Sequence, residues 1–256
     1  MVEVTERVNP DESPPKPDAR SERWREHRQA VRQSFVDAAL TAIDSHGPDV
    51  SMGDIASTAG AAKPKLYRHF ADKSDLYAAI VEHVREMLWN RILLATNLFE
   101  DSVSTLIERG TSEYAVIVSE QPNLFRFLVH SHFAGRAGNR RTDESSAGPD
   151  PALDSARAAA RKLAEVFADA TGADPENSSA IELVSYSAFG AVASATDWWL
   201  GDSDARPPVM TIETFASYVA ALMVGIVESS CVIAGVTIDA DQPLHTAFST
   251  EGDELL

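Results

Sequence analysis

The chain has 256 residues, enough for one large domain or two small ones, and a net charge of −17 at pH 7. Its 44% hydrophobic content and 7% aromatic content are typical of a globular protein with a buried core. No run of apolar residues approaches the ~18 that a membrane span requires, and the N-terminus lacks the apolar core of a signal peptide. The single cysteine, Cys231, excludes an intrachain disulfide framework and a multi-cysteine metal site. We therefore expect a cytoplasmic protein.

The acidic charge is unevenly distributed along the chain. Residues 20–73 contain nine Lys or Arg and seven Asp or Glu, a balance of +2. Residues 74–256 contain 11 basic and 27 acidic residues. An acidic surface repels nucleic acid, whereas a segment with a positive balance can approach it. This asymmetry favours a DNA-binding segment attached to an acidic effector body over a general nucleic-acid coat protein.

The first residues change from acidic and proline-rich to basic. Residues 1–19 contain four prolines and few apolar residues, which predicts a disordered tail. The following arginines, among them Arg25 and Arg28, are consistent with a basic arm that reaches phosphates or a minor groove. They are equally consistent with a solvated helix start, and both interpretations remain open. Apolar residues at a 3–4 spacing then predict a helix from about Arg28 to His46.

Residues 51–73, SMGDIASTAGAAKPKLYRHFADK, have the pattern of two short helices joined by a tight turn. Ser51 is a good N-cap, and Asp54 stands three residues later at the spacing of a capping box. Gly60 suits the left-handed position that ends a helix. Pro64 suits the first turn of the next helix, where its missing N–H is not needed.

The second helix of this pair has a buried stripe and a basic outer side. Leu66 and Phe70, at i and i+4, form the stripe. The outward residues are Lys63, Lys65, Tyr67, Arg68 and His69. A major-groove reader needs this distribution, so the sequence predicts a helix-turn-helix. An ordinary helical hairpin with a solvated basic face is the alternative, and the turn length, the small Ala56 and the Tyr-x-His-Phe ending argue against it.

The segment from Ser51 to Ile80, SMGDIASTAGAAKPKLYRHFADKSDLYAAI, together with the helix before it, resembles the tetracycline-repressor (TetR) family of bacterial transcription regulators. This resemblance implies an all-α fold, with an N-terminal three-helix helix-turn-helix domain and a C-terminal helical domain for ligand binding and dimerisation. One departure is Ala62, because many members have a Ser there that caps the recognition helix. The missing hydroxyl puts one backbone or phosphate contact in doubt.

The resemblance also implies roles for individual residues. Lys65 and its outward neighbours would contact base edges, and Tyr67, His69 and Lys73 would grip phosphates. The predicted DNA-contacting residues are Arg25, Arg28, Ser51, Lys63, Lys65, Tyr67, Arg68, His69 and Lys73.

A fourth helix is predicted to connect the DNA-binding segment to the rest of the chain. Asp72 is suited to cap it, with Asp75 in its first turn, where a carboxylate is favourable for the helix dipole. Lys73 lies at this helix start, where backbone N–H groups and an ammonium can hold one phosphate. The apolar pattern continues to about Asn97, and a packed helix of that length can transmit a tilt as a rigid element.

The remaining chain is predicted to be helical, with a mobile Gly-rich loop at 134–150. The predicted domains are a DNA-binding domain over 20–73 and a ligand-binding and dimerisation domain over 74–238. Residues 239–256 contain Pro and acidic residues and are predicted to be a loosely ordered tail.

Two late helices have apolar residues at a regular 3–4 spacing. The residues predicted to form a dimer interface are Ile181, Val184, Ala188, Ala191, Ala195, Ile212, Phe215, Val219, Leu222 and Ile226. One interpretation packs this pattern inside the monomer. The other, which we favour, is a four-helix bundle built from two copies, because a helix-turn-helix reads a palindromic site best as a twofold dimer.

The motifs of common enzymes and cofactor sites are missing: there is no GxGxxG, phosphate loop, GxSxG or HExxH. We therefore expect neither an enzyme nor a cofactor or metal. A helical body can hold a small molecule in an apolar pocket with a few polar groups. The candidate lining residues, each of which is more often core than pocket, are Trp89, Leu93, Phe125, Leu128, Phe133, Tyr186, Phe189 and Trp199. The segment DWWLGDSDARPP and its flanking helices look similar to actinobacterial TetR members that respond to fatty acyl compounds.

The sequence thus predicts a dimeric, ligand-responsive transcriptional regulator, most often a repressor in this family. It would leave a palindromic DNA operator when a small, largely apolar ligand of fatty-acyl type binds the helical body. The alternative is an acidic helical protein-interaction module whose helix-turn-helix does not read DNA. Ala62 and the net charge of −17 motivate that alternative.

Overall fold

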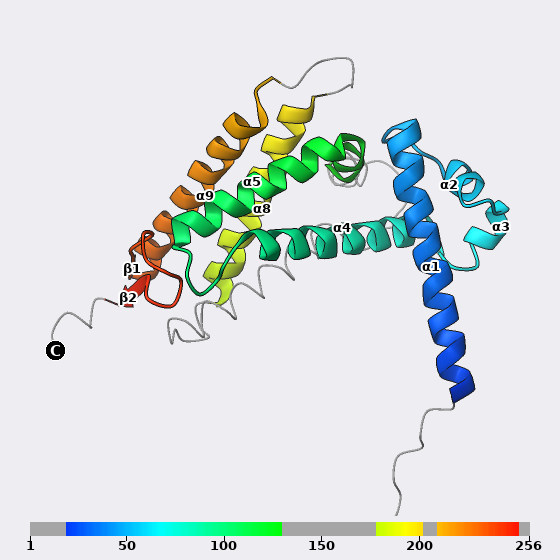
Figure 1. The fold of residues 1–256 in the computed structure, drawn as a ribbon, viewed down its shortest axis with the longest axis horizontal. Coiled ribbons are helices and arrows are strands. Elements are labelled where there is room, and N and C mark those ends of the chain that lie inside the picture. Colours follow the sequence, from blue (N-terminus) through cyan, green and yellow to red (C-terminus); the bar gives the residue numbers. More distant parts are fainter. Residues whose placement is uncertain (1–18, 130–177, 202–208, 251–256) are drawn as a thin grey trace, which may run out of the picture.

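The computed structural model describes residues 19–129, 178–201 and 209–250. Three helices lie at one end, α4 leads away from them, and a bundle that contains α5, α8 and α9 lies at the other end (Figure 1). The helices are α1 (Ala19–His46), α2 (Met52–Thr58), α3 (Lys63–Leu66), α4 (Lys73–Ala95), α5 (Val103–Glu120), α8 (Ser178–Leu200) and α9 (Ile212–Ala234). Residues 122–129 are also helical, and two short strands, β1 (Val236–Ile238) and β2 (Phe248–Thr250), follow α9. The predicted all-α class is confirmed.

The N-terminal unit, α1 to α3, is built around a small apolar core. Phe35 and Ile43 of α1 are buried against Ile55 of α2 and Leu66 of α3. Phe70, which follows α3, is fully buried and meets the Phe35 ring edge-on at 6.4 Å. Because these side chains come from every helix of the unit, their burial fixes how α2 and α3 are held across α1.

The helix ends of the N-terminal unit are set by the predicted local devices. The Ser51 backbone N–H donates to the Asp54 carboxylate at 2.9 Å, and the Asp54 N–H donates to the Ser51 hydroxyl at 3.3 Å. This is the capping box, which satisfies two N–H groups that the first turn would leave without partners. Gly60 has a φ of 60°, the left-handed conformation that favours glycine after a helix end.

Helix α1 begins earlier than predicted. It is one continuous helix from Ala19 to His46, so Arg25 and Arg28 lie on a helix instead of an extended arm. The side chains of residues 23–30 are all exposed, because this part of α1 extends beyond the apolar core of the N-terminal unit. The sequence could not show this, since a helix that is exposed on every side has no apolar stripe.

Helix α4 joins the N-terminal unit to the helical body, which we define as α5, helical residues 122–129, α8 and α9. Asp72 caps α4 as predicted, accepting from the Asp75 N–H at 2.8 Å. The Tyr77 hydroxyl of α4 donates to the Leu128 carbonyl at 3.1 Å. The Asn123 side chain donates to the Asp44 carbonyl near the end of α1 at 3.2 Å. Residues 122–129 therefore contact both α4 and α1.

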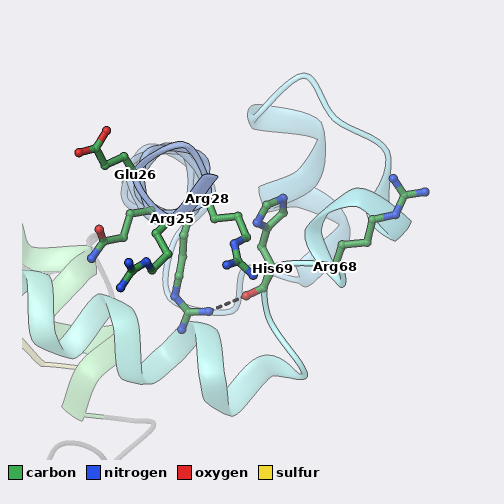
Figure 2. Close-up of a pocket in the computed structure, with 7 residues that line it drawn as sticks. Arg25, Glu26, Arg28, Arg68 and His69 are labelled. Atoms are coloured by element: carbon green, nitrogen blue, oxygen red, sulfur yellow. Dashed lines mark hydrogen bonds between the residues drawn. The ribbon is translucent and has the colours of Figure 1, made fainter. Parts of the chain in front are cut away.

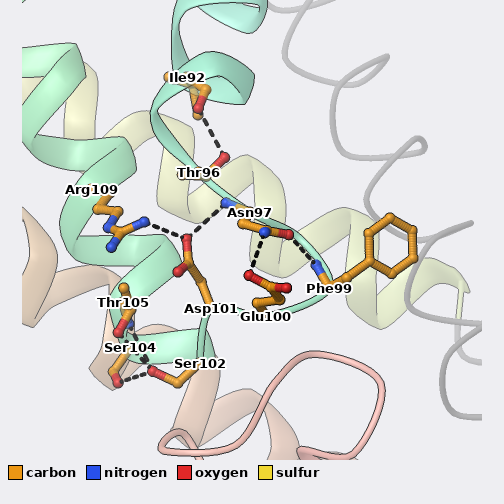
Figure 3. Close-up of polar contacts among 10 residues, drawn as sticks. All are labelled: Ile92, Thr96, Asn97, Phe99, Glu100, Asp101, Ser102, Ser104, Thr105 and Arg109. Atoms are coloured by element: carbon orange, nitrogen blue, oxygen red, sulfur yellow. Dashed lines mark hydrogen bonds and ion pairs between the residues drawn. The ribbon is translucent and has the colours of Figure 1, made fainter.

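The loop between α4 and α5 is held by its own polar groups (Figure 3). The Asp101 carboxylate accepts from the Asn97 backbone N–H at 2.7 Å and from the Arg109 guanidinium at 2.9 Å. Ser102 then caps α5, because its hydroxyl accepts from the Thr105 N–H at 3.2 Å. These bonds fix where α5 begins relative to the end of α4.

The prediction of a loosely ordered tail is wrong for residues 239–250. Strands β1 and β2 pair antiparallel, with Val236 opposite Thr250. The carbonyls of Ala240 and Gln242 accept hydrogen bonds from Ser104 and Val103, at 2.9 and 3.0 Å. The tail thus supplies partners for N–H groups that the first turn of α5 leaves unpaired. These partners are distant in sequence, so local composition did not reveal them.

The helical body closes around two aromatic rings and one buried arginine. Trp199 stacks on Phe215 at 4.1 Å with ring planes 7° apart, and its ring N–H donates to the Met210 carbonyl at 3.0 Å. Arg126 is 7% exposed and donates to the Leu200 and Gly201 carbonyls at 2.9 and 3.2 Å. A cation at the C-terminal end of a helix is favourable for the helix dipole, so Arg126 stabilises the end of α8.

Candidate nucleic-acid interface

The recognition helix is shorter than the sequence suggests. Helix α3 contains one turn, Lys63–Leu66, and its N-cap residue Ala62 makes no side-chain hydrogen bond, as the missing hydroxyl predicted. A hydrogen-bonded turn continues the path, with the N–H groups of His69 and Phe70 both donating to the Leu66 carbonyl, at 2.9 and 3.0 Å. Tyr67, Arg68 and His69 therefore follow the helix on a tight turn instead of lying in a longer helix.

The polar residues of this segment point outward. The buried members are Leu66 and Phe70. The predicted DNA-contacting residues that are exposed are Arg25, Arg28, Ser51, Lys63, Lys65, Tyr67, Arg68 and Lys73, and His69 is half-buried. The Lys63 ammonium lies 6.0 Å from the centre of the Tyr67 ring, within reach of a cation–π contact. The N-terminal unit thus presents cationic and aromatic side chains on the surface that a major-groove reader uses.

A basic groove lies between α1 and the turn after α3 (Figure 2). In the figure, Arg25 and Arg28 project from α1, Arg28 toward His69, whereas Arg68 extends away from α1. The residues that line this basic groove are Arg25, Glu26, Arg28, Gln29, Arg32, Arg68 and His69. One carboxylate among four guanidinium groups leaves the groove strongly positive, which suits an anion such as a phosphate.

The groove arginines are not equivalent. Arg25, Arg28 and Arg68 make no hydrogen bond or ion pair with the residues that the structure describes, so their donors are available to an anion. Arg32 instead donates to the His69 carbonyl and to the Asp75 carboxylate, both at 2.5 Å. Among the described residues, three of the four groove arginines thus have no partner, and the fourth joins α1 to the segments on either side of Phe70.

The electrostatics of the groove affect His69. Partial burial lowers the pKa of His69 below its usual 6.5, and the positive charges of Lys65, Arg32, His27 and Arg68 lower it further. At pH 7, which lies above this lowered pKa, the imidazole is mostly neutral in the absence of DNA. A phosphate beside it would favour the protonated form, so binding to a phosphate would be coupled to proton uptake.

Sequence reasoning missed three groove residues, Glu26, Gln29 and Arg32. Arg25, Arg28 and Arg32 follow an i, i+3, i+7 spacing that places them on one side of α1. That spacing was the available signal, but it does not say which neighbour the arginines face.

The ligand candidates divide between packed core and exposed surface. Trp199 is stacked in the core, and Phe125 is buried edge-on against Tyr114 at 5.8 Å. Trp89 and Leu93 on α4 are exposed. Leu128, Tyr186 and Phe189 are half-buried, and Phe133 is outside the described residues. Trp199 and Phe125 are therefore packed against other rings in the core of the helical body.

The dimer candidates are also divided. Phe215 and Val219 are each 2% exposed within one protomer and belong to its own core, as does the buried Ala188. Leu222 is 52% exposed. Val184, Ala191, Ala195, Ile212 and Ile226 are half-buried, and the side chain of Ile181 is outside the described part. The expectation that Phe215, Val219 and Ala188 face a partner is corrected, because these side chains are buried within their own protomer.

Helix α9 is apolar on more than one side. By length and composition alone it could cross a membrane, with a mean hydropathy of 1.8 over residues 212–233. Only 22% of this apolar stretch is buried in the protomer. One such helix is weak evidence for a membrane span, since a helix covered on two sides within a bundle has the same composition.

Both parts of the chain match models of known protein families. Residues 35–80 match the family model described as bacterial regulatory proteins, tetR family, and residues 100–230 match the tetracyclin repressor-like C-terminal domain. An uncharacterised helix-turn-helix transcriptional regulator of Mycobacterium tuberculosis is 28% identical over 218 residues, 84% of this chain and 86% of that protein. The transcriptional repressor LfrR of Mycolicibacterium smegmatis is 32% identical over 60 residues, 23% of this chain and 31% of that protein.

Solved structures agree on the fold. A tetR-family regulator from Streptomyces coelicolor aligns with a TM-score of 0.54 at 19% identity, over 81% of this chain and 83% of that one. A tetR-family regulator from Pectobacterium atrosepticum aligns with a TM-score of 0.52 at 20% identity, over 80% and 96%. The two family models match most of the N-terminal unit and the helical body, and the second alone covers more than half of the chain. The chain therefore belongs to the TetR family of DNA-binding bacterial transcriptional regulators.

Proposed function

We propose that the chain is a dimeric repressor that binds a palindromic operator and leaves it when a small, largely apolar ligand enters the helical body. The observation that carries the DNA-binding part is the set of exposed cations on and beside α3. Lys63, Lys65 and Arg68 face solvent while Leu66 and Phe70 are buried beneath them.

The proposed contacts divide between bases and phosphates. Lys65 reads base edges from the exposed side of α3, and Tyr67, His69 and Lys73 hold phosphates. Lys73 is the first residue of α4, where backbone N–H groups of the first turn also favour an anion. Arg25 and Arg28 extend this phosphate-binding surface along α1 into the basic groove. Phosphate contacts fix register and orientation, and base contacts select the sequence.

The dimer is supported by exposed stripes on α8 and α9. On α9, Tyr218, Leu222 and Val232 are 63%, 52% and 78% exposed, with the exposed Gly225 between them. On α8, Leu183 and Trp198 are 66% and 56% exposed. On α9, Tyr218, Leu222 and Gly225 follow a 4–3 spacing, and the small Gly225 allows a partner helix to approach closely. On α9, the exposed Tyr218 and Gly225 directly precede the predicted dimer residues Val219 and Ile226. Leu222 belongs to the predicted stripe and to the exposed one.

The ligand part rests on the apolar character of the body. Its residues are helical and mostly apolar, and pockets in such bundles are lined by apolar side chains with a few polar groups. The similarity of the segment around Trp199 to fatty-acyl-responsive members makes a long apolar chain our first candidate. The ligand must bind the DNA-free conformation more tightly than the DNA-bound one, because equal affinity would shift nothing.

The DNA-binding part is tested with the full-length protein and a random DNA library. We expect a palindromic sequence to be enriched, with binding that weakens steeply as salt rises. Lys73→Ala is expected to weaken binding to all sequences and to lower the salt slope by about one. Lys65→Ala is expected to change the selected bases, and an unchanged preference would contradict its role.

The dimer is tested by native mass spectrometry of the same protein. A mass of twice 27.7 kDa supports it, and an adduct would identify the ligand class by its mass. Leu222→Glu should yield monomers, because it places a charge in the proposed interface. Leu94→Glu is the matched control, since Leu94 is 88% exposed on α4, and this variant should remain dimeric. A wild-type monomer at all concentrations would contradict the dimer.

A second candidate function is an acidic protein-interaction module that does not read DNA. The uncapped start of α3 at Ala62 favours it, because a short helix without a cap is held less firmly. Enrichment of one palindrome with steep salt dependence would exclude it. Binding to every DNA sequence with equal affinity, or to none, would favour it over the repressor.

A further inference from the structure

Arg32 contacts three residues that follow α3 in the chain, His69, Phe70 and Asp75. It lies on α1, and its guanidinium donates to the backbone carbonyl of His69 at 2.5 Å, the bond marked in Figure 2. It also donates to the Asp75 carboxylate at 2.5 Å and lies 4.1 Å from the centre of the Phe70 ring. A planar guanidinium can make these directional contacts together, which an ammonium cannot.

Asp75 supplies the other half of this arrangement. Its carboxylate accepts from Arg32 and from the Ala71 backbone N–H at 3.0 Å. Its own backbone N–H donates to the side chain of Asp72 at 2.8 Å. The hydrogen bond from Arg32, and then that from Ala71, lower the pKa of Asp75 below its usual 3.8, so the carboxylate is charged at neutral pH. Arg32 and Asp75 together hold both sides of the turn between α3 and α4.

This turn carries the groups that the proposed function assigns to phosphates. Tyr67 and His69 lie in this turn, and Lys73 follows it as the first residue of α4, all within seven residues of chain. The pair bonds the backbone of His69 itself and that of Ala71, which lies between His69 and Lys73. Recognition geometry must be held closely, because a donor that is misplaced by about 1 Å loses much of its contribution.

We propose that the Arg32–Asp75 pair positions the turn between α3 and α4 for DNA reading. The inference rests on the proposed function and names positioning residues that this function does not include. Through the pair, α1, the turn and the first turn of α4 are joined, so a tilt of α4 is transmitted to the phosphate-binding groups.

The competing role for Arg32 is a direct contact to phosphate, since it lines the basic groove. The two roles predict opposite effects for Asp75. A carboxylate near DNA repels the backbone, so its neutralisation should strengthen binding if charge alone matters. If Asp75 positions the turn, its neutralisation should instead weaken specific binding. Testing the acid therefore separates positioning from charge, which a test of the arginine alone would not.

The experiment measures two affinities of the full-length protein at one salt concentration, for the selected operator and for an unrelated duplex of equal length. For Asp75→Asn we expect the operator affinity to fall about tenfold, the loss of one charged hydrogen bond, while affinity for the unrelated duplex stays the same or rises. Glu26→Gln is the matched control, because it removes the same charge from an exposed residue of the same groove. It should weaken neither affinity.

Arg32→Lys gives a second, independent measurement. It keeps the positive charge but cannot bond His69 and Asp75 in the same fork. We expect it to lose operator affinity while keeping affinity for the unrelated duplex. A wild-type operator affinity for this variant would overturn the proposal, because it would mean that charge alone is required.

The remaining outcomes are also decisive. Operator binding by Asp75→Asn that equals or exceeds that of the wild type would overturn the proposal. A parallel fall of both affinities, in proportion to the unfolded fraction seen by circular dichroism, would also overturn it, since the pair would then only stabilise the fold. If the wild-type protein selects no DNA sequence, the proposed function itself fails, and this result is visible before any variant is made.

Discussion

The capping contacts of the N-terminal unit and the side-chain contacts that close the helical body differ in how far they reach along the chain. In the N-terminal unit and at the start of α4, the capping bonds join Ser51 to Asp54 and Asp72 to Asp75, three residues apart. In the body, the Tyr114 hydroxyl bonds that of Thr196, 82 residues away, and Arg126 bonds the Leu200 carbonyl, 74 residues away. The first kind of contact is visible in the sequence, and the second kind is created by the fold.

The apolar contacts differ in the same way. The helices of the N-terminal unit are short or have one apolar side, so the pattern shows which residues are buried. Helices α8 and α9 have apolar residues on several sides, and the pattern alone does not say which side faces the protomer. Phe215 and Val219 turned out to face inward, and Tyr218 faces outward. For a helix with more than one apolar side, only the packing of the neighbouring helices determines which side is buried.

The largest expected effect is in the core of the N-terminal unit. Phe70→Ala should cost about 3–5 kcal/mol of unfolding free energy, because it leaves a cavity where a fully buried ring packs against Phe35. Hydrogen exchange should accelerate in α2 and α3 more than in α5 and α9. Tyr67→Ala is the control, since Tyr67 is 45% exposed and its loss should change stability little. Equal acceleration throughout would mean that the two regions unfold as one unit.

A smaller effect is expected from the buried arginine of the body. Arg126→Met should cost about 2–3 kcal/mol, because the carbonyls of Leu200 and Gly201 lose a charged donor. Chemical denaturation measures this loss, and hydrogen exchange should place it at the end of α8. Arg85→Met makes the same substitution at an exposed ion pair with Glu82, where we expect about 0–1 kcal/mol. Similar losses for both variants would show that burial of Arg126 adds nothing.

The local cap should have a modest effect. Ser51→Ala should cost about 1 kcal/mol, since the Asp54 N–H loses its partner in the capping box. The thermal unfolding midpoint measures the change. Ser57→Ala, an exposed site within α2, should leave it nearly unaltered. A loss as large as that of Arg126→Met would contradict the distinction between local and long-range contacts.

The smallest effect at neutral pH is expected from the long-range hydroxyl pair. Tyr114→Phe removes one hydrogen bond to Thr196 and should cost about 1 kcal/mol or less. Burial raises the pKa of Tyr114 from 10 to about 12. The unfolded chain therefore ionises first, and wild-type stability should fall as the pH rises from 10 toward 12. Tyr114→Phe should show a shallower fall in denaturation midpoints over this range, and an identical fall would contradict the burial of this hydroxyl.

The sequence by itself determined the features that depend on neighbours within one or two helical turns. The capping box at Ser51, the left-handed Gly60, the missing cap at Ala62, the Asp72 cap and the buried Leu66 and Phe70 were all predicted. These features also carry the family resemblance, because spacing, turn chemistry and one-sided burial are properties of a short segment. The predicted outward cations of α3 are exposed for the same reason.

Only the tertiary structure decided what depends on distant partners. It turned Arg32 toward His69 and Asp75, paired the tail with β1 and the start of α5, and chose which sides of α8 and α9 face the core. An arginine on an exposed helix has the same local signature whether it binds DNA or a carboxylate of its own chain. Which partner it finds depends on how the helices pack, and that is settled by burial across the whole fold, not by the residues beside it.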